Sequence, residues 1–90
     1  MQASAAELYS RLEEHLNHGD VDGSLQILDQ ICRQHEDHAG AWELRGLLES
    51  KAGRPNLAIA YFQRAAGLAP LEPWSSRMMA IQYIGLDQRA

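Results

Sequence analysis

Apolar residues recur every three or four positions along most of the chain. This spacing is typical of one face of an α-helix, whereas a half-buried strand would alternate at every second position. Five groups can be separated, spanning Leu8 to Leu16, Leu25 to Cys32, Trp42 to Leu48, Leu57 to Leu68 and Met78 to Ile84. The pattern therefore predicts an all-α protein of five helices, with no strand.

Capping and turn residues mark where the predicted helices begin and end. Ser4 and Glu7 have the spacing of a capping box, and Asp20 is suited to cap the second helix. Gly19 and Gly53 stand where the chain has to reverse, because glycine adopts positive φ at little cost. Since every connection is short, we expect consecutive helices to pack as antiparallel hairpins.

A shift of 34 residues superimposes the first part of the chain on the second. The apolar character, the turn glycine and one arginine recur in the pairs Leu8 and Trp42, Arg11 and Arg45, Gly19 and Gly53, Leu25 and Ile59, Leu28 and Phe62, and Ile31 and Ala65. The match continues across the turn, so the repeating unit is a helix, a turn and a second helix.

The second copy resembles the tetratricopeptide repeat (TPR) family. Residues 39–72 carry the residue types of that motif at matching positions, namely Trp42, Gly46, Gly53, Ala58, Tyr61, Phe62, Ala65 and Pro70. Small Gly46 allows the two helices to approach closely, and Trp42 and Phe62 fill the space beside them. Arg45 and Glu49 depart from the family, which usually has a leucine and an aromatic residue at these positions.

The resemblance implies a single domain over residues 1–90, built as a short right-handed superhelical solenoid of stacked hairpins. It divides into a degenerate first repeat, a second repeat, and a terminal helix or the start of a third repeat, at residues 5–38, 39–72 and 73–86. The last helix can be aligned without a shift, placing Ala80 at the position of Gly46, or two residues earlier, placing Trp74 at that of Trp42. We prefer the unshifted alignment.

Composition narrows the class of function. A chain of 90 residues is too small to enclose a large active-site cavity on its own. Its net charge of -4 disfavours a nucleic-acid surface. The single cysteine, Cys32, forms no disulfide framework, and no stretch reaches the roughly 20 apolar residues of a membrane span. We expect a cytoplasmic module that binds neither nucleic acid nor membrane.

Candidate chemistry is sparse. The pairs His15 with His18 and His35 with His38 end antiparallel helices, so their four rings should not converge on one metal ion. Cys32 lies on the apolar side of its predicted helix, and no neighbouring lysine or metal-binding cysteine is present to activate its thiol. No nucleophile elbow or phosphate-binding glycine loop occurs. We therefore predict no enzyme activity, no metal and no cofactor.

In the TPR family the first helix of each repeat lines a concave groove that binds peptides. The resemblance implies that the partner-binding residues here are Tyr9, Glu13, Leu16 and Asn17, then Glu43, Leu44, Leu47 and Lys51, and finally Arg77, Met78, Ile81 and Ile84. This groove is apolar, with Lys51 and Arg77 as its obvious cations. Family members that hold the C-terminal carboxylates of chaperone tails use several lysines, arginines and asparagines there, so we do not expect that ligand.

These observations predict non-catalytic recognition of a partner helix or extended peptide in an apolar groove. One alternative is homodimerisation through the last helix, which would bury Met78, Ile81 and Ile84. Another is that the chain is an N-terminal auxiliary domain of a larger enzyme. For Leu44, Leu47, Met78 and Ile81, packing together as core at the junction of neighbouring first helices is a further alternative.

Overall fold

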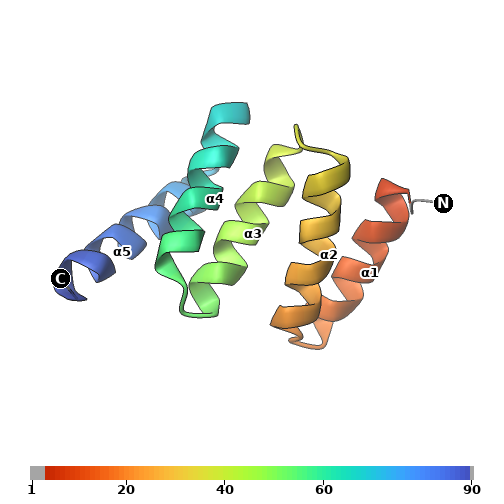
Figure 1. The fold of residues 1–90 in the computed structure, drawn as a ribbon, viewed down its shortest axis with the longest axis horizontal. Helices are drawn as coiled ribbons and strands as arrows, with labels where there is room; N and C mark the ends of the chain where they lie inside the picture. The colour runs from red at the N-terminus through yellow and green to blue at the C-terminus, as the bar shows by residue number, and fades with distance from the viewer. Residues whose placement is uncertain (1–3, 90) are drawn as a thin grey trace.

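The computed structural model describes residues 4–89, and this part of the chain folds into five α-helices without any strand. The helices are α1 (Ala5–Asn17), α2 (Val21–Gln34), α3 (Ala39–Lys51), α4 (Pro55–Leu68) and α5 (Pro73–Arg89) (Figure 1). The prediction of an all-α protein of five helices is therefore confirmed. None of the described helices combines the length and the apolar character needed to cross a membrane.

The helix boundaries recur with the 34-residue spacing found in the sequence. α1 and α3 begin at Ala5 and Ala39, and α2 and α4 begin at Val21 and Pro55. α5 begins at Pro73, which is again 34 residues after the start of α3. This start agrees with the unshifted alignment of the last helix.

The turns inside the two hairpins share one backbone geometry. Gly19 and Gly53 have φ values of 69° and 79°, in the left-handed region. Each glycine N–H donates to the carbonyl three residues earlier, at 3.1 Å in both turns. A residue with a Cβ atom is strained at this φ, so glycine is required for both chain reversals.

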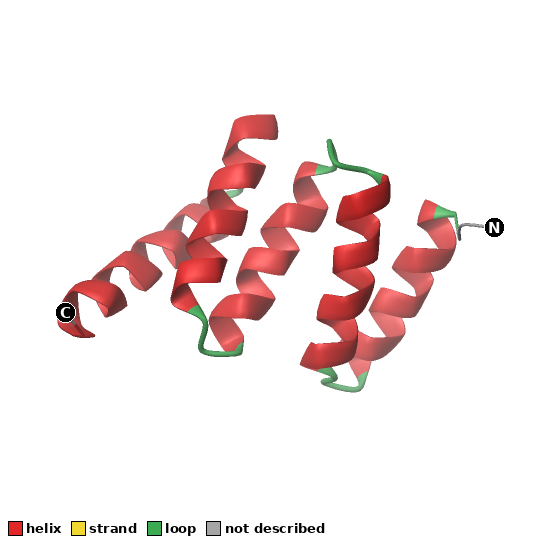
Figure 2. Cartoon of the chain, viewed as in Figure 1, coloured by secondary structure: helices red, strands yellow, loops and turns green. Residues whose placement is uncertain are grey.

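Consecutive helices pack on one another, and α5 also contacts α3. Figure 2 shows α2 and α4 nearer the viewer, with α1, α3 and α5 behind them. The first helix of each 34-residue unit therefore lies in the rear layer. Among the described residues, α3 and α5 approach each other more closely than α1 and α3 do.

The two hairpins fill the contact between their helices with different pairs of side chains. In the first hairpin, Leu12 and Leu28 are buried in a core that also contains Leu8, Ile31, Cys32, Ala41 and Leu48. The equivalent residues of the second hairpin are Gly46 and Phe62. A Cβ atom placed on Gly46 would lie 2.9 Å from the Phe62 ring, which is fully buried. Gly46 is thus required by the position of the ring.

The two residues of α3 that depart from the TPR pattern both have charged partners. Arg45 donates to the Asp29 carboxylate of α2 at 2.9 Å. Glu49 is buried and accepts from Arg54, just before α4, at 2.8 Å. Because each inward charge is paired, α3 accommodates polar groups at positions where the resemblance implies apolar ones.

Asp20 caps the N-terminus of α2, as predicted. Its carboxylate accepts from the Gly23 N–H at 2.9 Å and lies 2.9 Å from Nδ1 of His15. The hydrogen bond from Gly23, followed by that from His15, holds the pKa of Asp20 below its ordinary value.

We expect this cap to make the protein sensitive to acid. Because the pKa of Asp20 is lower in the folded state, its stabilising contribution is complete above about pH 4 and is lost as the pH falls through the folded pKa. Asparagine also caps helices but does not titrate. Thermal melts followed by circular dichroism should therefore show a larger loss for wild type than for Asp20→Asn between about pH 4.5 and pH 2. Equal losses in the two proteins would contradict this assignment.

Candidate functional site

The sequence-predicted groove residues lie on α1, α3 and α5, the helices of the rear layer, and we call their surface the α1/α3/α5 face. Three apolar side chains of this set are exposed: Leu16 at 38%, Ile81 at 51% and Ile84 at 56%. Leu44, Leu47 and Met78 are half-buried. The face therefore combines half-buried apolar side chains with apolar side chains that are exposed at the surface.

α5 carries most of this exposed apolar surface. Ile81 and Ile84 lie seven and ten residues after Trp74, a spacing that brings all three to one side of the helix. Trp74 is exposed as well, although it was not predicted to be a groove residue. Contiguous exposed apolar surface of this kind is often a binding site in a soluble protein.

Four polar candidates are exposed, and these are Glu13, Asn17, Lys51 and Arg77. Arg33, Arg45 and Arg54 each pair with a carboxylate, whereas Lys51 and Arg77 take part in none of the ion pairs found in residues 4–89. The two predicted cations are therefore available to an acidic group from outside.

Tyr9 and His38 join the start of α3 to α1. The Tyr9 hydroxyl lies 2.8 Å from Nε2 of His38, and Nδ1 of the same ring accepts from the Ala41 N–H at 3.3 Å. The Tyr9 hydroxyl also lies 3.1 Å from Nδ1 of His38, and the two rings are tilted against each other with their centres 5.3 Å apart. Partial burial raises the pKa of Tyr9. This pair fixes one edge of the α1/α3/α5 face.

Glu43 was predicted to line the groove, but its carboxylate is withdrawn from the surface. The residue is only 6% exposed and accepts a hydrogen bond of 2.8 Å from the hydroxyl of Ser75, which is itself fully buried. We therefore assign Glu43 to the contact between α3 and α5. The sequence holds no signal for this bond, since Ser75 lies 32 residues further along the chain.

A small pocket opens where α1 and α3 end and α2 begins. It has a volume of about 90 Å³ and is lined by Leu16, Gly19, Asp20, Val21, Ser24, Leu48 and Lys51. Leu16 and Lys51 were predicted as groove residues, whereas the other lining residues were not. These residues come together because of the distance between α1 and α3. The periodicity of the sequence does not define that distance.

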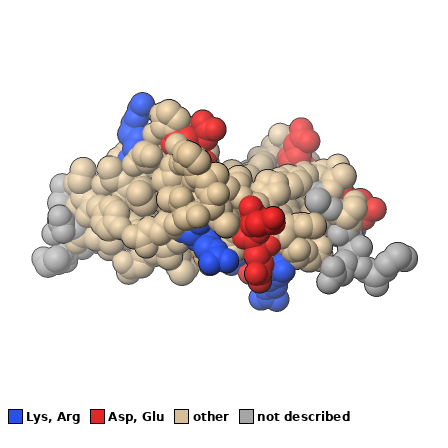
Figure 3. All heavy atoms as spheres, turned by 90° about the horizontal axis from the view of Figure 1, so that it is seen from above, with Lys and Arg blue, Asp and Glu red and all other residues tan. Residues whose placement is uncertain are grey.

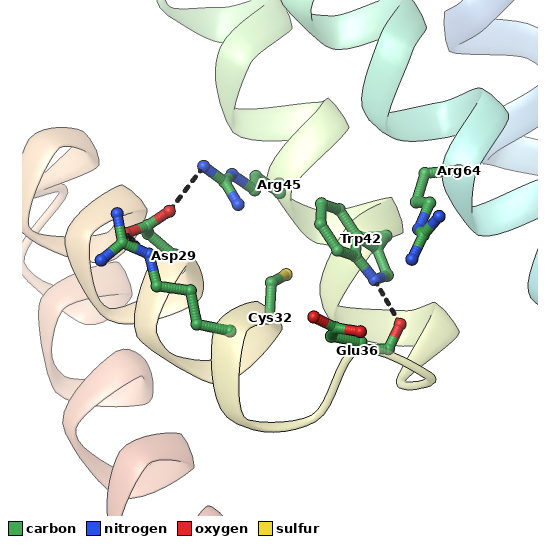
Figure 4. Close-up of a pocket in the computed structure, with 7 residues that line it drawn as sticks. Asp29, Cys32, Glu36, Trp42, Arg45 and Arg64 are labelled. Carbon is green, nitrogen blue, oxygen red and sulfur yellow. Dashed lines mark hydrogen bonds and ion pairs between the residues drawn. The ribbon is translucent and has the colours of Figure 1, made fainter.

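A second pocket, of about 210 Å³, lies between α2, α3 and α4 (Figure 4). The Asp29 carboxylate in its wall pairs with Arg33 at 3.0 Å and with Arg45 at 2.9 Å. Trp42 is held by a hydrogen bond of 3.0 Å from its indole N–H to the Glu36 carbonyl. The Asp29 carboxylate therefore forms ion pairs with two arginines.

Two arginines of this second pocket, Arg45 and Arg64, also contact aromatic rings. The Arg45 guanidinium lies 4.2 Å from the centre of the Tyr61 ring, and that of Arg64 lies 5.4 Å from the centre of Trp42. Cation–π contacts of this geometry are stabilising. The network joins α2, α3 and α4, so we interpret this pocket as a structural junction.

We interpret the remaining side chains with reactive groups as structural. Burial raises the pKa of the Cys32 thiol, and the smaller opposing influence of Arg45 does not reverse this. A buried thiol of raised pKa is a poor nucleophile. Residues 4–89 contain no group of three or more histidine, cysteine, aspartate or glutamate side chains arranged to hold a metal ion. The view in Figure 3 shows charges of both signs in small groups among uncharged atoms.

Comparison of the chain with protein-family models and with curated proteins finds no match.

Proposed function

We propose that this chain is a non-catalytic protein-interaction module of the TPR type. Its five helices form a short right-handed superhelical solenoid, and its α1/α3/α5 face binds a helix or extended peptide of a partner protein. The observation that carries this proposal is the exposed apolar stripe of Ile81 and Ile84 on α5, together with exposed Leu16 on α1.

Three features support the repeat assignment. Helix boundaries recur every 34 residues, both hairpins turn on a glycine of positive φ, and the first helices of the units share one layer. Each unit of such an array covers part of the apolar surface of its neighbour. On α5 the apolar side chains of Ile81 and Ile84 remain exposed.

The chemistry of the face favours an amphipathic partner with acidic residues. Leu16, Ile81 and Ile84 provide apolar contact, and Lys51 and Arg77 add positive charge without ion-pair partners in residues 4–89. Apolar anchors flanked by complementary charge give both affinity and orientation. We place this module in the cytoplasm, with no nucleic-acid or membrane partner and no cofactor.

Self-assembly is the second candidate function, and the same stripe on α5 favours it. In this version Met78, Ile81 and Ile84 pack against α5 of a second copy, and the module dimerises an assembly or a fused enzyme. Light scattering over a wide concentration range separates the two functions. A monomer at all concentrations supports partner recognition, whereas a dimer that Ile81→Glu converts to a monomer supports self-assembly.

Partner recognition itself is tested by selection from a phage-displayed library of random twelve-residue peptides against the full chain. The proposal predicts enriched peptides that combine aliphatic or aromatic residues with aspartate or glutamate. Enrichment no greater than that on an immobilised unrelated protein would reject peptide recognition.

A further inference from the structure

We infer that the pocket between the ends of α1 and α3 is the anchor subsite for the partner. This inference rests on the proposed function and specifies it: the pocket takes one aliphatic side chain of a peptide, and Lys51 pairs with a carboxylate next to that side chain in the bound peptide.

The shape and lining of the pocket fit a single aliphatic side chain. Leu16, Val21 and Leu48 provide apolar walls, and the volume of about 90 Å³ is well below the roughly 300 Å³ at which pockets begin to enclose whole small-molecule ligands. Leu16 is also part of the exposed apolar surface of the face. A peptide lying on the α1/α3/α5 face can therefore insert one residue here without leaving that surface.

The charge at the rim of the pocket indicates which chemical group of the peptide lies next to the aliphatic side chain. The Ser24 hydroxyl donates to the Asp20 carbonyl at 2.7 Å, and the Asp20 carboxylate is engaged by the Gly23 N–H and by His15. Lys51, in contrast, has no hydrogen bond or ion pair from its side chain to any described residue. The side chain of Asp20 is still 45% exposed in the same lining, but its carboxylate already has partners. Lys51 is therefore the cation of this rim without a partner, and it complements a carboxylate of the ligand.

The α1/α3/α5 face also differs in charge between its two ends. Glu13 is exposed on α1, Lys51 lies at the end of α3, and Arg77 is exposed on α5. Glu43 adds no accessible charge because it is buried against Ser75. A peptide with its carboxylates near Lys51 and Arg77 therefore avoids the repulsion that it would meet beside Glu13.

The test uses peptides selected on the full chain and labelled for fluorescence anisotropy. Lys51→Glu should weaken a selected peptide by about tenfold or more, and replacing the anchoring carboxylate of the peptide by lysine should restore binding to that variant. Serine in place of the aliphatic anchor should weaken binding to wild type by about tenfold or more. The matched control is Arg64→Glu, since this exposed arginine lies on α4, and it should leave the affinity unchanged.

The outcomes separate this inference from the proposed function. Peptides that lose affinity with Ile81→Glu but bind Lys51→Glu and Arg64→Glu equally well would overturn the anchor subsite and leave the binding face in place. A Lys51→Glu loss without rescue by the lysine peptide would also overturn it. If the library gives no specific peptide, the proposed function fails, and the anchor subsite fails with it.

Discussion

Replacing Gly46 with leucine is expected to destabilise the protein by about 2 kcal/mol. The Cβ atom alone would come within 2.9 Å of the buried Phe62 ring, and leucine adds three further carbon atoms at this contact. Overpacking of a filled core costs about 1–3 kcal/mol, and the closed contact with the ring places this substitution at the upper end of that range, of which a gain of about 1 kcal/mol in helix propensity offsets part. Chemical denaturation gives the free energy of unfolding directly, and the melting temperature should fall by roughly 8–16 °C.

A second substitution shows whether the two hairpins are equivalent units. Leu12 and Leu28 stand at the positions of Gly46 and Phe62 in the first hairpin, so Gly46→Leu with Phe62→Leu copies that pair into the second. We expect Phe62→Leu alone to cost about 1–2 kcal/mol, and the double variant to be at least about 1 kcal/mol more stable than the sum of the single losses. Strictly additive losses would contradict the equivalence of the two contacts.

Ile81→Glu is expected to weaken binding of a selected peptide by about a hundredfold while leaving the fold intact. Ile81 is 51% exposed near the middle of α5, and glutamate is a good helix former, so the free energy of unfolding should change by less than about 0.5 kcal/mol. At a central apolar contact the same change removes a hydrophobic anchor and places an unpaired charge in the interface. Titration by fluorescence anisotropy measures this loss.

The chain offers a close control for that experiment. Leu57 is 41% exposed, comparable with Ile81, but it lies on α4 in the other layer. Leu57→Glu introduces the same charge at a similarly exposed apolar residue, and it should leave the affinity within about twofold of wild type. Equal losses for Ile81→Glu and Leu57→Glu would show that charge alone, and not the α1/α3/α5 face, governs binding.

The elements of the fold were predictable because their signals are local. Apolar spacing predicted five helices, Asp20 predicted the cap of α2, and the glycines predicted both chain reversals. Each of these features depends on residues within one or two helical turns of each other. The 34-residue recurrence then predicted where α5 starts.

The polar contacts between helices could not be predicted in the same way. Arg45 pairs with Asp29 across 16 residues of chain, and Glu43 binds Ser75 across 32 residues. Helical phase puts a side chain on a face, but the distance between two faces depends on how the helices pack. Glu43 was therefore predicted as a groove residue from its helical phase alone, although tertiary packing buries it.

The pocket beside Lys51 could not be predicted for the same reason, because its lining depends on how the helices pack. Leu16 and Lys51 were found from the sequence as separate groove residues, whereas Val21 and Leu48 join them only through the packing of α1, α2 and α3. Trp74 was missed because the two alignments of the last helix give it different surroundings. The stripe of Ile81 and Ile84 was within reach of the sequence, since helical spacing alone places both residues on one side of the last helix.

The central claim is that the α1/α3/α5 face binds a partner, and backbone amide chemical shifts of the full chain during titration with a selected peptide test it most directly. We expect the largest changes at Leu16, Leu47, Lys51, Ile81 and Ile84, with small changes along the exposed sides of α2 and α4. Changes concentrated around Asp29, Arg33 and Arg64 would instead place the ligand in the pocket between α2, α3 and α4, and would contradict this account.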